Sequence, residues 1–281
     1  MRWLRRIFSF ARQYLASTRV FLVYGIAVGV IIAMPLAPRP EIAVISLTGS
    51  IRQGMVDETL DTINDAMSNR RIRAVVLQID SPGGEVCAIE QIYLDLTRLR
   101  EKKPIVATVG TIAASGGYYV AQGANYIYAE KGSQIGSIGV WVRLPDAEEL
   151  DETMMTTGLF KATGGSKRKV IAWLEMMRKQ FTGVVISERG SRLKLTEEVL
   201  SRAEIYLGTE GLNYGLIDAI GTKSDAVRKA AQMAHIRNYK VIDISPESES
   251  LTIILGKADI DTIKATPHLV PVYYYLYFES E

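Results

Sequence analysis

Cysteine and histidine are almost absent from this chain of 281 residues, which contains one cysteine and two histidines. The single cysteine, Cys87, excludes an internal disulfide, a thiolate metal cluster and a CxxC redox pair. Both histidines, His235 and His268, lie more than a hundred residues after Ser115, which is our candidate nucleophile. A histidine base shortly after that serine is therefore excluded, and lysine becomes the candidate base.

The chain also lacks an excess of charge of either sign. It has 33 basic and 31 acidic residues, a formal net charge of +2 that gives no support to a nucleic acid as partner. Hydrophobic residues make up 48% of the chain and charged residues 23%. This composition predicts a globular domain with a substantial core.

Charge is missing altogether between Val20 and Pro38. The preceding segment contains no acidic residue but five arginines, namely Arg2, Arg5, Arg6, Arg12 and Arg19. An uncharged run of about 19 residues behind a basic flank predicts a transmembrane helix at 20–38 and a cytoplasmic segment at 1–19. The rest of the chain is then extracytoplasmic, at the cell membrane. Two alternatives are a buried core helix and a signal peptide cleaved before Pro38, which the missing proline N–H disfavours.

After the prolines at the end of this run, short apolar strands alternate with amphipathic helices. Residues 42–47, 74–79 and 104–109 have the composition of strands, and apolar residues recur at helical spacing in 56–67 and 86–99. This order predicts an α/β domain over 41–250 with a largely parallel sheet covered by helices. Further along we expect strands at 126–130 and 138–142 and helices at 145–157, 170–188, 196–203 and 223–234.

The C-terminal segment 251–281 contains two apolar pieces, 251–255 and 269–278, and neither is long enough to span a membrane. The second piece is rich in tyrosine. It is compatible with an edge strand, an oligomer contact or a surface-binding tail, and Pro271 argues against a central strand. We expect packing or an oligomer contact.

Two glycine-containing junctions carry the chemistry that the sequence suggests. Ser115 stands between small residues and two glycines directly after an apolar run, and 80–84 (Asp-Ser-Pro-Gly-Gly) follows another such run. Sites in α/β folds form where strands end, and glycines there can direct bare N–H groups at negative charge. The first junction supplies a nucleophile and the second supplies donors. Taken alone, 81–84 is also compatible with an ordinary tight turn.

A serine hydroxyl needs a base, and a neutral lysine can act as one. The ordinary pKa of a lysine, about 10.4, must then fall by about 2 to 3 units through burial and nearby positive charge. The segment 161–169 supplies three candidates, Lys161, Lys167 and Lys169. Without the serine junction, the same run would be read as a solvated basic turn.

Five segments between residues 42 and 234 together carry a family resemblance. They are 79–84, 113–119, 135–140, the lysine segment 161–169, and 203–208 with 215–218. In order and spacing they resemble the signal peptide peptidase A family, membrane-bound Ser-Lys peptidases with a ClpP/crotonase-like fold of repeated β-β-α units. The first two are specific, and the later ones are supportive.

The resemblance implies a role for each of several residues. Ser115 is the nucleophile and Lys167 the general base, Gly84 and Gly116 supply the oxyanion-hole N–H groups, and Ser137 hydrogen-bonds the lysine. No metal or organic cofactor is implied. Because 168–169 leads directly into the apolar residues 170–174, the lysine segment is shorter than is common in the family. Lys169 and Lys161 therefore remain alternatives to Lys167.

The expected function is that of a membrane-anchored serine endopeptidase. The resemblance implies extended peptides such as signal-peptide remnants as substrates, and a ring-like homo-oligomer that encloses the sites. A crotonase-like enzyme acting on acyl thioesters is a second interpretation, although it gives Ser115 no purpose. A third is a membrane scaffold or binding protein that has kept the fold and lost the activity.

Overall fold

The computed structural model describes residues 18–33, 39–143, 157, 160, 164–246 and 273–276. The chain divides into one unit of Met1–Arg39 and a second of Pro40–Glu281. Helix α2 (Thr18–Ala33) belongs to the first unit. Among the described residues, no helix has both the length and the apolar character needed to cross a membrane. The anchor predicted at 20–38 stays a prediction, and its residues 34–38 lie outside the described part.

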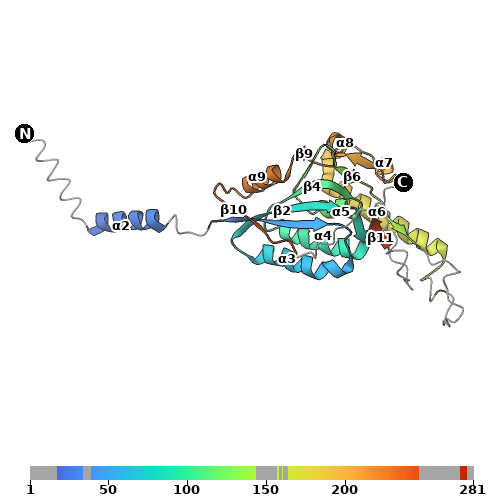
Figure 1. The fold of residues 1–281 in the computed structure, drawn as a ribbon, viewed down its shortest axis with the longest axis horizontal. Coiled ribbons are helices and arrows are strands. Elements are labelled where there is room, and N and C mark those ends of the chain that lie inside the picture. Colours follow the sequence, from blue (N-terminus) through green and yellow to red (C-terminus); the bar gives the residue numbers. More distant parts are fainter. Residues whose placement is uncertain are drawn as a thin grey trace, which may run out of the picture. The chain divides into compact units, whose positions relative to one another are not determined.

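A parallel sheet forms the centre of the second unit (Figure 1). Its strands in spatial order are β10 (Lys240–Asp243), β1 (Glu41–Thr48), β2 (Ile72–Ser81), β4 (Ile105–Ala114), β5 (Tyr126–Ala129) and β9 (Ala219–Ile220). Each neighbouring pair in this order runs parallel. The α/β class and the largely parallel sheet expected from the sequence are thereby confirmed.

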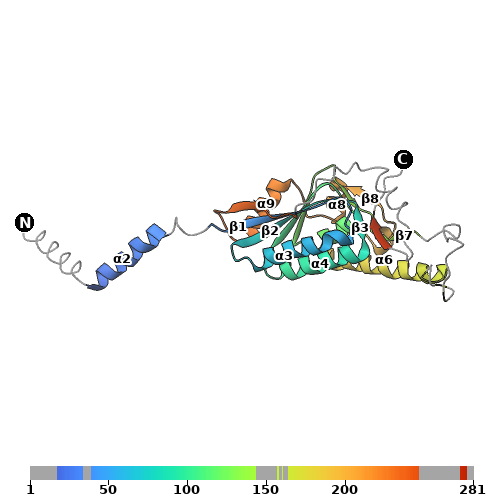
Figure 2. The ribbon, with the colours of Figure 1, turned by 60° about the horizontal axis from the view of Figure 1, so that its bottom comes forward.

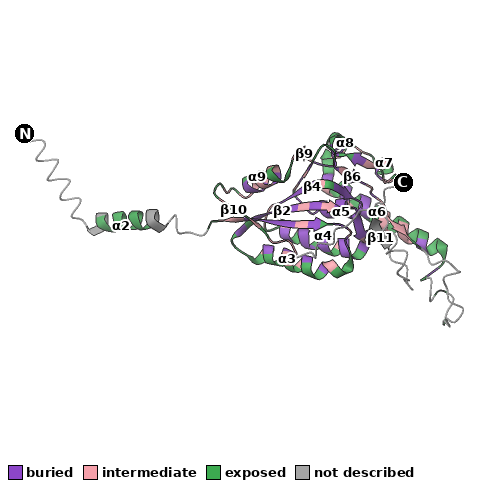
Figure 3. Ribbon diagram, viewed as in Figure 1, coloured by how far each residue is buried: buried purple, intermediate pink, exposed green. Residues whose placement is uncertain are grey.

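Helices cover both faces of this sheet (Figure 2), with α3 (Val56–Ser68) and α4 (Val86–Arg100) on one face and α9 (Lys223–Met233) on the other. Because successive strand residues point to opposite faces, Ala43 and Ile45 pack in the cluster that contains α3 and α4, whereas Val44 packs with α9. Burial is accordingly concentrated between the layers (Figure 3). Both cores are apolar, and they hold the strand ends in fixed positions.

The remaining described elements connect these layers. They are the 3₁₀ turns Gln53–Met55 and Gly190–Arg192, the strands β3 (Gly83–Glu85), β6 (Gln134–Gly136), β7 (Trp141–Val142), β8 (Ile205–Leu207) and β11 (Tyr273–Leu276), and the helices α5 (Gly116–Ala121), α6 (Lys167–Arg189), α7 (Glu197–Leu200) and α8 (Gly208–Tyr214). Strand β6 pairs in parallel with the end of β4 and antiparallel with β8.

Several predicted boundaries differ from the structure. The strand expected at 138–142 is present only as β7. The helix expected at 196–203 ends at Leu200, and the backbone soon leaves helical geometry because Ala203 has a φ of 54°. Helix α6 begins earlier than residue 170 because Ser166 caps it, accepting a hydrogen bond from the Lys169 N–H. The helix expected at 145–157 lies outside the described residues except for Thr157, which is in a bend.

A second, smaller sheet has the order β3–β11–β7, and β11 runs antiparallel to both neighbours. The tyrosine-rich piece therefore contributes a central strand, and the inference drawn from Pro271 is wrong. The strand begins at Tyr273, two residues after the proline, so the proline withholds no N–H from the pairing. Because β11 pairs with residues almost two hundred positions earlier, it lies beside the second glycine junction, 80–84.

Candidate active site

Ser115 lies at the junction between β4 and α5, with a φ of 51° and a ψ of −118°. Positive φ is unfavourable for a residue with a side chain, and strain of this kind is concentrated at functional sites. The Ser115 N–H donates to the Gly136 carbonyl over 2.7 Å, and its carbonyl accepts from the Tyr119 N–H over 2.9 Å. The residue is only 1% exposed. The junction thus holds the serine in a fixed, strained conformation.

The hydroxyl of Ser115 is only loosely held. It is 3.5 Å from the Gly139 carbonyl oxygen, at the outer limit for a hydrogen bond. This contact with Gly139 is the side-chain hydrogen bond that the structure describes for Ser115. Because the contact is long, a base brought close to the hydroxyl could readily replace Gly139 as the acceptor. Gly139 lies in the segment 135–140 that supports the family resemblance, but no pattern in the sequence indicates that its carbonyl faces the serine.

The second junction is anchored through Ser81, which is fully buried. Its hydroxyl donates to the Gly49 carbonyl over 2.7 Å and accepts from the Gly83 N–H over 3.1 Å. Gly83 has a φ of 111°, which favours glycine. A Cβ on Gly84 would lie 1.9 Å from the Ile51 carbonyl oxygen, so no side chain fits there. This is more than an ordinary turn, because contacts with Gly49 and Ile51 fix its backbone.

These contacts also determine where the N–H of Gly84 points. Ile51 pairs with this strand by donating to the Gly83 carbonyl and accepting from the Glu85 N–H. Backbone groups alternate sides along a strand, so the N–H and carbonyl of Gly84 face away from Ile51. They face the side on which β11 lies, where Gly84 is paired with Tyr275.

The two junctions pack against each other. Helix α5 contacts β3, and a Cβ on Gly117 would lie 2.4 Å from the Ser81 carbonyl oxygen. Gly116 is the first residue of α5, where backbone N–H groups have no partner within the helix. The structure therefore brings Ser115, Gly116 and Gly84 to the same end of the sheet, as the sequence predicts.

Ser137 joins this group from the neighbouring strand. Gly136 of β6 is paired with Ala114 of β4, so Ser115 and Ser137 leave two adjacent strands at the same level. Ser137 also has a φ of 51°, and its N–H donates to the Glu204 carbonyl over 2.8 Å. It is half-buried.

The lysines are placed differently. Lys167 is exposed and is the first residue of α6, and no hydrogen bond or ion pair joins it to Ser115 within the described residues. Lys169 is also exposed, and its Nζ lies 4.7 Å from the centre of the Trp173 ring. Lys161 lies outside the described residues. The structure therefore does not bring any of the described candidate lysines to the serine of the same chain.

The course of α6 explains this separation. Its C-terminal half packs on α5 through Phe181, whose ring centre is 4.9 Å from that of Tyr119. Lys167 precedes Phe181 by four helical turns, about 21 Å along the axis at 1.5 Å per residue. Along this N-terminal half, Ile171 is 65% exposed and Met176 is 53% exposed. This half of α6 presents the lysine, together with apolar side chains, to its surroundings.

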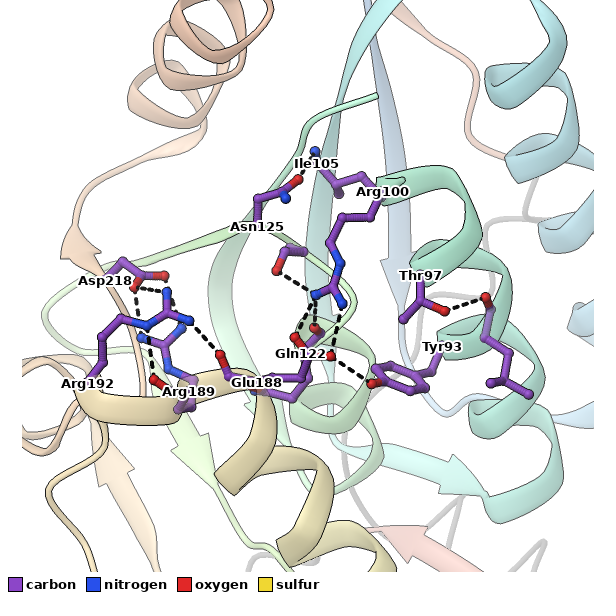
Figure 4. A network of polar contacts seen from close by, with 12 residues as sticks. Tyr93, Thr97, Arg100, Ile105, Gln122, Asn125, Glu188, Arg189, Arg192 and Asp218 are labelled. Carbon is purple, nitrogen blue, oxygen red and sulfur yellow. Dashed lines mark hydrogen bonds and ion pairs between the residues drawn. The ribbon is translucent and has the colours of Figure 1, made fainter. Parts of the chain in front are cut away.

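A network of buried and half-buried charges fixes the other end of α6 (Figure 4). Arg100 on α4 makes two hydrogen bonds to Glu188, of 2.7 and 2.9 Å, and Tyr93 donates to the same carboxylate over 3.1 Å. Burial, followed by the charge of Glu188, raises the pKa of Tyr93 to about 12. Burial would also raise the pKa of Glu188, but the hydrogen bond and charge of Arg100 outweigh it and the pKa is lowered.

Next to it, Asp218 binds two arginines of the same helix end. Arg189, 2% exposed, donates to both carboxylate oxygens over 2.9 and 3.0 Å, and Arg192 donates over 2.8 Å. Burial favours the neutral acid, but the hydrogen bond and charge of Arg189 lower the pKa of Asp218 below its ordinary value. Periodicity in the sequence did not reveal this network, because its partners are far apart along the chain.

Two family models and several known proteins match this chain. The model of peptidase family S49 matches residues 97–237, and that of the Clp protease family matches residues 40–134. A protein of Synechocystis sp. that is named as a protease is 32% identical over 217 residues, which are 72% of this chain and 78% of the relative. Protease 4 of Haemophilus influenzae is 30% identical over 228 residues, 74% of this chain but only 37% of the relative.

Among solved structures, the 1510-N membrane-bound stomatin-specific protease superposes with a TM-score of 0.52 at 17% identity. The match covers 75% of this chain and all of that one. At this level of identity it supports the fold alone, a mixed α/β fold of the ClpP type. The family match includes Ser115 and reaches from the end of α4 through α9. The chain belongs to peptidase family S49, to which signal peptide peptidase A belongs, and it is a serine endopeptidase.

Proposed function

We propose that Ser115 is the nucleophile of this peptidase and that the N–H groups of Gly84 and Gly116 form its oxyanion hole. The observation that carries the proposal is the strained backbone of Ser115 close to Gly84, whose N–H points away from Ile51. The hydroxyl attacks the peptide carbonyl, and the two donors stabilise the negative oxygen of the tetrahedral intermediate. An acyl-enzyme forms as the amine leaves, and water then hydrolyses it.

We propose Lys167 as the base, contributed by a neighbouring copy of the chain. Its exposure and its position about 21 Å along α6 from the packing contact on α5 support an intermolecular role. The exposed Ile171 and Met176 on the same half of the helix provide apolar surface for such a contact. Assembly would enclose the amine and remove it from water, the condition for a neutral lysine. In this proposal Ser137 hydrogen-bonds the amine.

The substrates in this proposal are extended peptides such as signal-peptide remnants. The family supplies this class, and the chemistry of the site is compatible with any peptide that can reach the serine. Residues 20–38 anchor the chain in the cell membrane, with 1–19 in the cytoplasm and the peptidase domain, 41–250, outside it. Support for the anchor comes from the uncharged run and the arginines in front of it. A ring-like homo-oligomer of crotonase-like β-β-α domains would admit only flexible chains.

The test uses the full chain in detergent and a fluorogenic peptide. We expect Ser115→Ala and Lys167→Ala to lower kcat by at least about 10³-fold, because each removes a group that acts in the chemical step. Lys179→Ala is the matched control. It removes another exposed lysine of α6, whose Nζ lies 3.8 Å from a carboxylate oxygen of Glu175, and it should change kcat less than twofold. Unaltered cleavage by Ser115→Ala would eliminate the mechanism, and loss of activity in Lys169→Ala but not Lys167→Ala would reassign the base.

Mixing the two inactive variants separates a lysine from the same chain from one contributed by a neighbour. In a randomly mixed oligomer, sites that take serine from one copy and lysine from the next regain about a quarter of the parent activity at equal proportions. If serine and lysine come from one chain, no mixed site is complete. Continued inactivity in oligomers shown to contain both variants would therefore contradict the intermolecular lysine.

A further inference from the structure

A cavity of about 520 Å³ lies between α4 and α6, against the helix that follows Ser115. Tyr119 of α5 is part of its lining, and the Tyr119 N–H donates to the Ser115 carbonyl over 2.9 Å. The volume is within the range of about 300–1,000 Å³ that is typical of small-molecule sites. None of the residues assigned to catalysis above belongs to the described lining, so the cavity needs a separate explanation.

The walls of the cavity combine aromatic rings with aliphatic side chains. Tyr93 of α4 and Tyr119 meet edge to face, with ring centres 5.1 Å apart and ring planes at 83°. Leu94 and Val184 add aliphatic surface from α4 and α6. Tyr119 is 4% exposed, and Tyr93 is held by its hydrogen bond to Glu188 (Figure 4). The surrounding structure therefore fixes the aromatic walls, as is usual for ligand sites that are largely preformed.

Glu90 gives this lining a negative charge that nothing in the described part of the chain balances. Its carboxyl group is half-buried, and burial raises its pKa above the ordinary value. No hydrogen bond or ion pair among the described residues ends on this carboxylate, whereas Glu188 is paired with Arg100. Burial first, and the charge of Glu90 second, raise the pKa of Tyr119. Of the described residues that line the cavity, Glu90 alone is charged, so a ligand that neutralises it carries one positive charge.

Gly183 leaves room on the α6 side of the cavity. It lies inside the helix, where glycine is less favourable than alanine. No close approach of another segment requires a glycine here, because an added Cβ would meet nothing within 4 Å. What the missing side chain provides is space. A helix-weakening residue that leaves room beside an unbalanced carboxylate is expected of a ligand site rather than of a packing contact.

We propose that this cavity binds a small organic monocation, namely a primary ammonium group carried on an aromatic or short aliphatic body. The ammonium group donates charge-assisted hydrogen bonds to the Glu90 carboxylate and lies against a tyrosine ring, where cation–π attraction adds to the affinity. The apolar body packs on Leu94 and Val184. The site is independent of the function proposed above, because it does not depend on which residues catalyse.

The experiment uses the full chain in a nonionic detergent and para-fluorophenethylammonium as the probe, whose fluorine NMR signal is followed in a titration. The comparison compound is para-fluorophenethyl alcohol, which has the same ring and chain without the positive charge. Glu90→Gln removes the negative charge and keeps the shape, whereas Gly183→Phe fills part of the cavity with no overlap at Cβ. Glu58→Gln, at an exposed position of α3, is the matched charge control. Urea unfolding and oligomer size are measured for each protein.

We expect the parent and Glu58→Gln to bind the ammonium probe with a Kd of about 1 mM or tighter, and the alcohol at least about tenfold more weakly. Glu90→Gln should weaken binding of the ammonium probe at least about tenfold, because a charge-assisted hydrogen bond is lost, and should bind the alcohol as the parent does. Gly183→Phe should bind neither compound. It should remain as stable as the parent, because phenylalanine forms helix better than glycine.

Several results would overturn the proposal. One is equal affinity of the parent and Glu90→Gln for the ammonium probe, and another is equal affinity of the parent for the ammonium and the alcohol. A parent that binds no probe, together with a changed oligomer size in Glu90→Gln, would show that a neighbouring copy covers the cavity instead. Ser115→Ala should bind the probe as the parent does. A parent that cleaves no peptide but binds the probe would therefore contradict the proposed function and leave this inference intact.

Discussion

Replacing Gly84 by alanine should separate the chemistry of the site from its stability. A Cβ at this position would lie 1.9 Å from the carbonyl oxygen of Ile51, and 2.6 and 2.7 Å from its carbonyl carbon and its nitrogen. All three are backbone atoms, so no side-chain rotation can relieve the overlap. The strand must move away from Ile51, and the Gly84 N–H moves with it. Overpacking of this kind costs about 1–3 kcal/mol in stability.

The effect on catalysis should be larger than the effect on folding. Losing one oxyanion donor lowers kcat by about 10²–10³-fold, equivalent to about 3–4 kcal/mol of transition-state stabilisation. We therefore expect Gly84→Ala to remain folded at 25 °C and to lose activity mainly through kcat. The assay is steady-state cleavage of a fluorogenic peptide by the full chain in detergent, with folding followed by urea denaturation.

The matched control is Gly54→Ala, in the turn that follows Ile51, where an added Cβ would meet nothing within 4 Å. It should leave kcat within about twofold of the parent and stability within about 1 kcal/mol. If folded Gly84→Ala keeps kcat within about threefold of the control, Gly84 does not supply an oxyanion donor.

Two further predictions concern the interior next to the site. Asp218→Asn leaves the buried Arg189 without its charged partner, so we expect a loss of about 3–5 kcal/mol in urea unfolding at pH 7. The folded-state pKa of Asp218 is lowered, so its stabilising contribution is complete above the unfolded pKa and is lost as the pH falls through the folded value. The difference between parent and variant should therefore shrink below about pH 4, and a constant difference down to pH 2 would contradict the assignment. Tyr118→Phe removes the 2.7 Å hydrogen bond to the Leu216 carbonyl and should cost about 1–3 kcal/mol, whereas unchanged unfolding would show that water replaces it.

The central layers of the fold were readable from the sequence because their signal is local. The runs that became β1, β2 and β4 contain six or more apolar or small residues, and α3 and α4 show their buried faces at helical spacing. Ser115 was likewise recognisable because the apolar run before it and the glycines after it are adjacent in the chain. The geometry of these parts follows from neighbours within a few residues.

The parts that escaped prediction depend on distant partners. Strands β6, β8 and β11 have three or four residues, too few for a period to be detected, and they form because of where the larger elements place their partners. The pairing of Tyr275 with Gly84 joins residues near opposite ends of the peptidase unit. The choice among Lys161, Lys167 and Lys169 could not be made from the sequence for a different reason. A run of basic residues indicates that a lysine base is present, but it does not determine which amine reaches the serine.

The backbone of Ser115 has a consequence for the evolution of this enzyme. With a φ of 51° and a ψ of −118°, the backbone of Ser115 favours a small side chain that is not branched at Cβ. Threonine, although it carries the same hydroxyl, adds a methyl group at the crowded carbon and is not an interchangeable nucleophile here. Glycine would relax the bend while abolishing the hydroxyl. Selection for robustness and selection for turnover therefore act in opposite directions at this one position, and a relative that no longer cleaves peptides would be free to drift toward glycine.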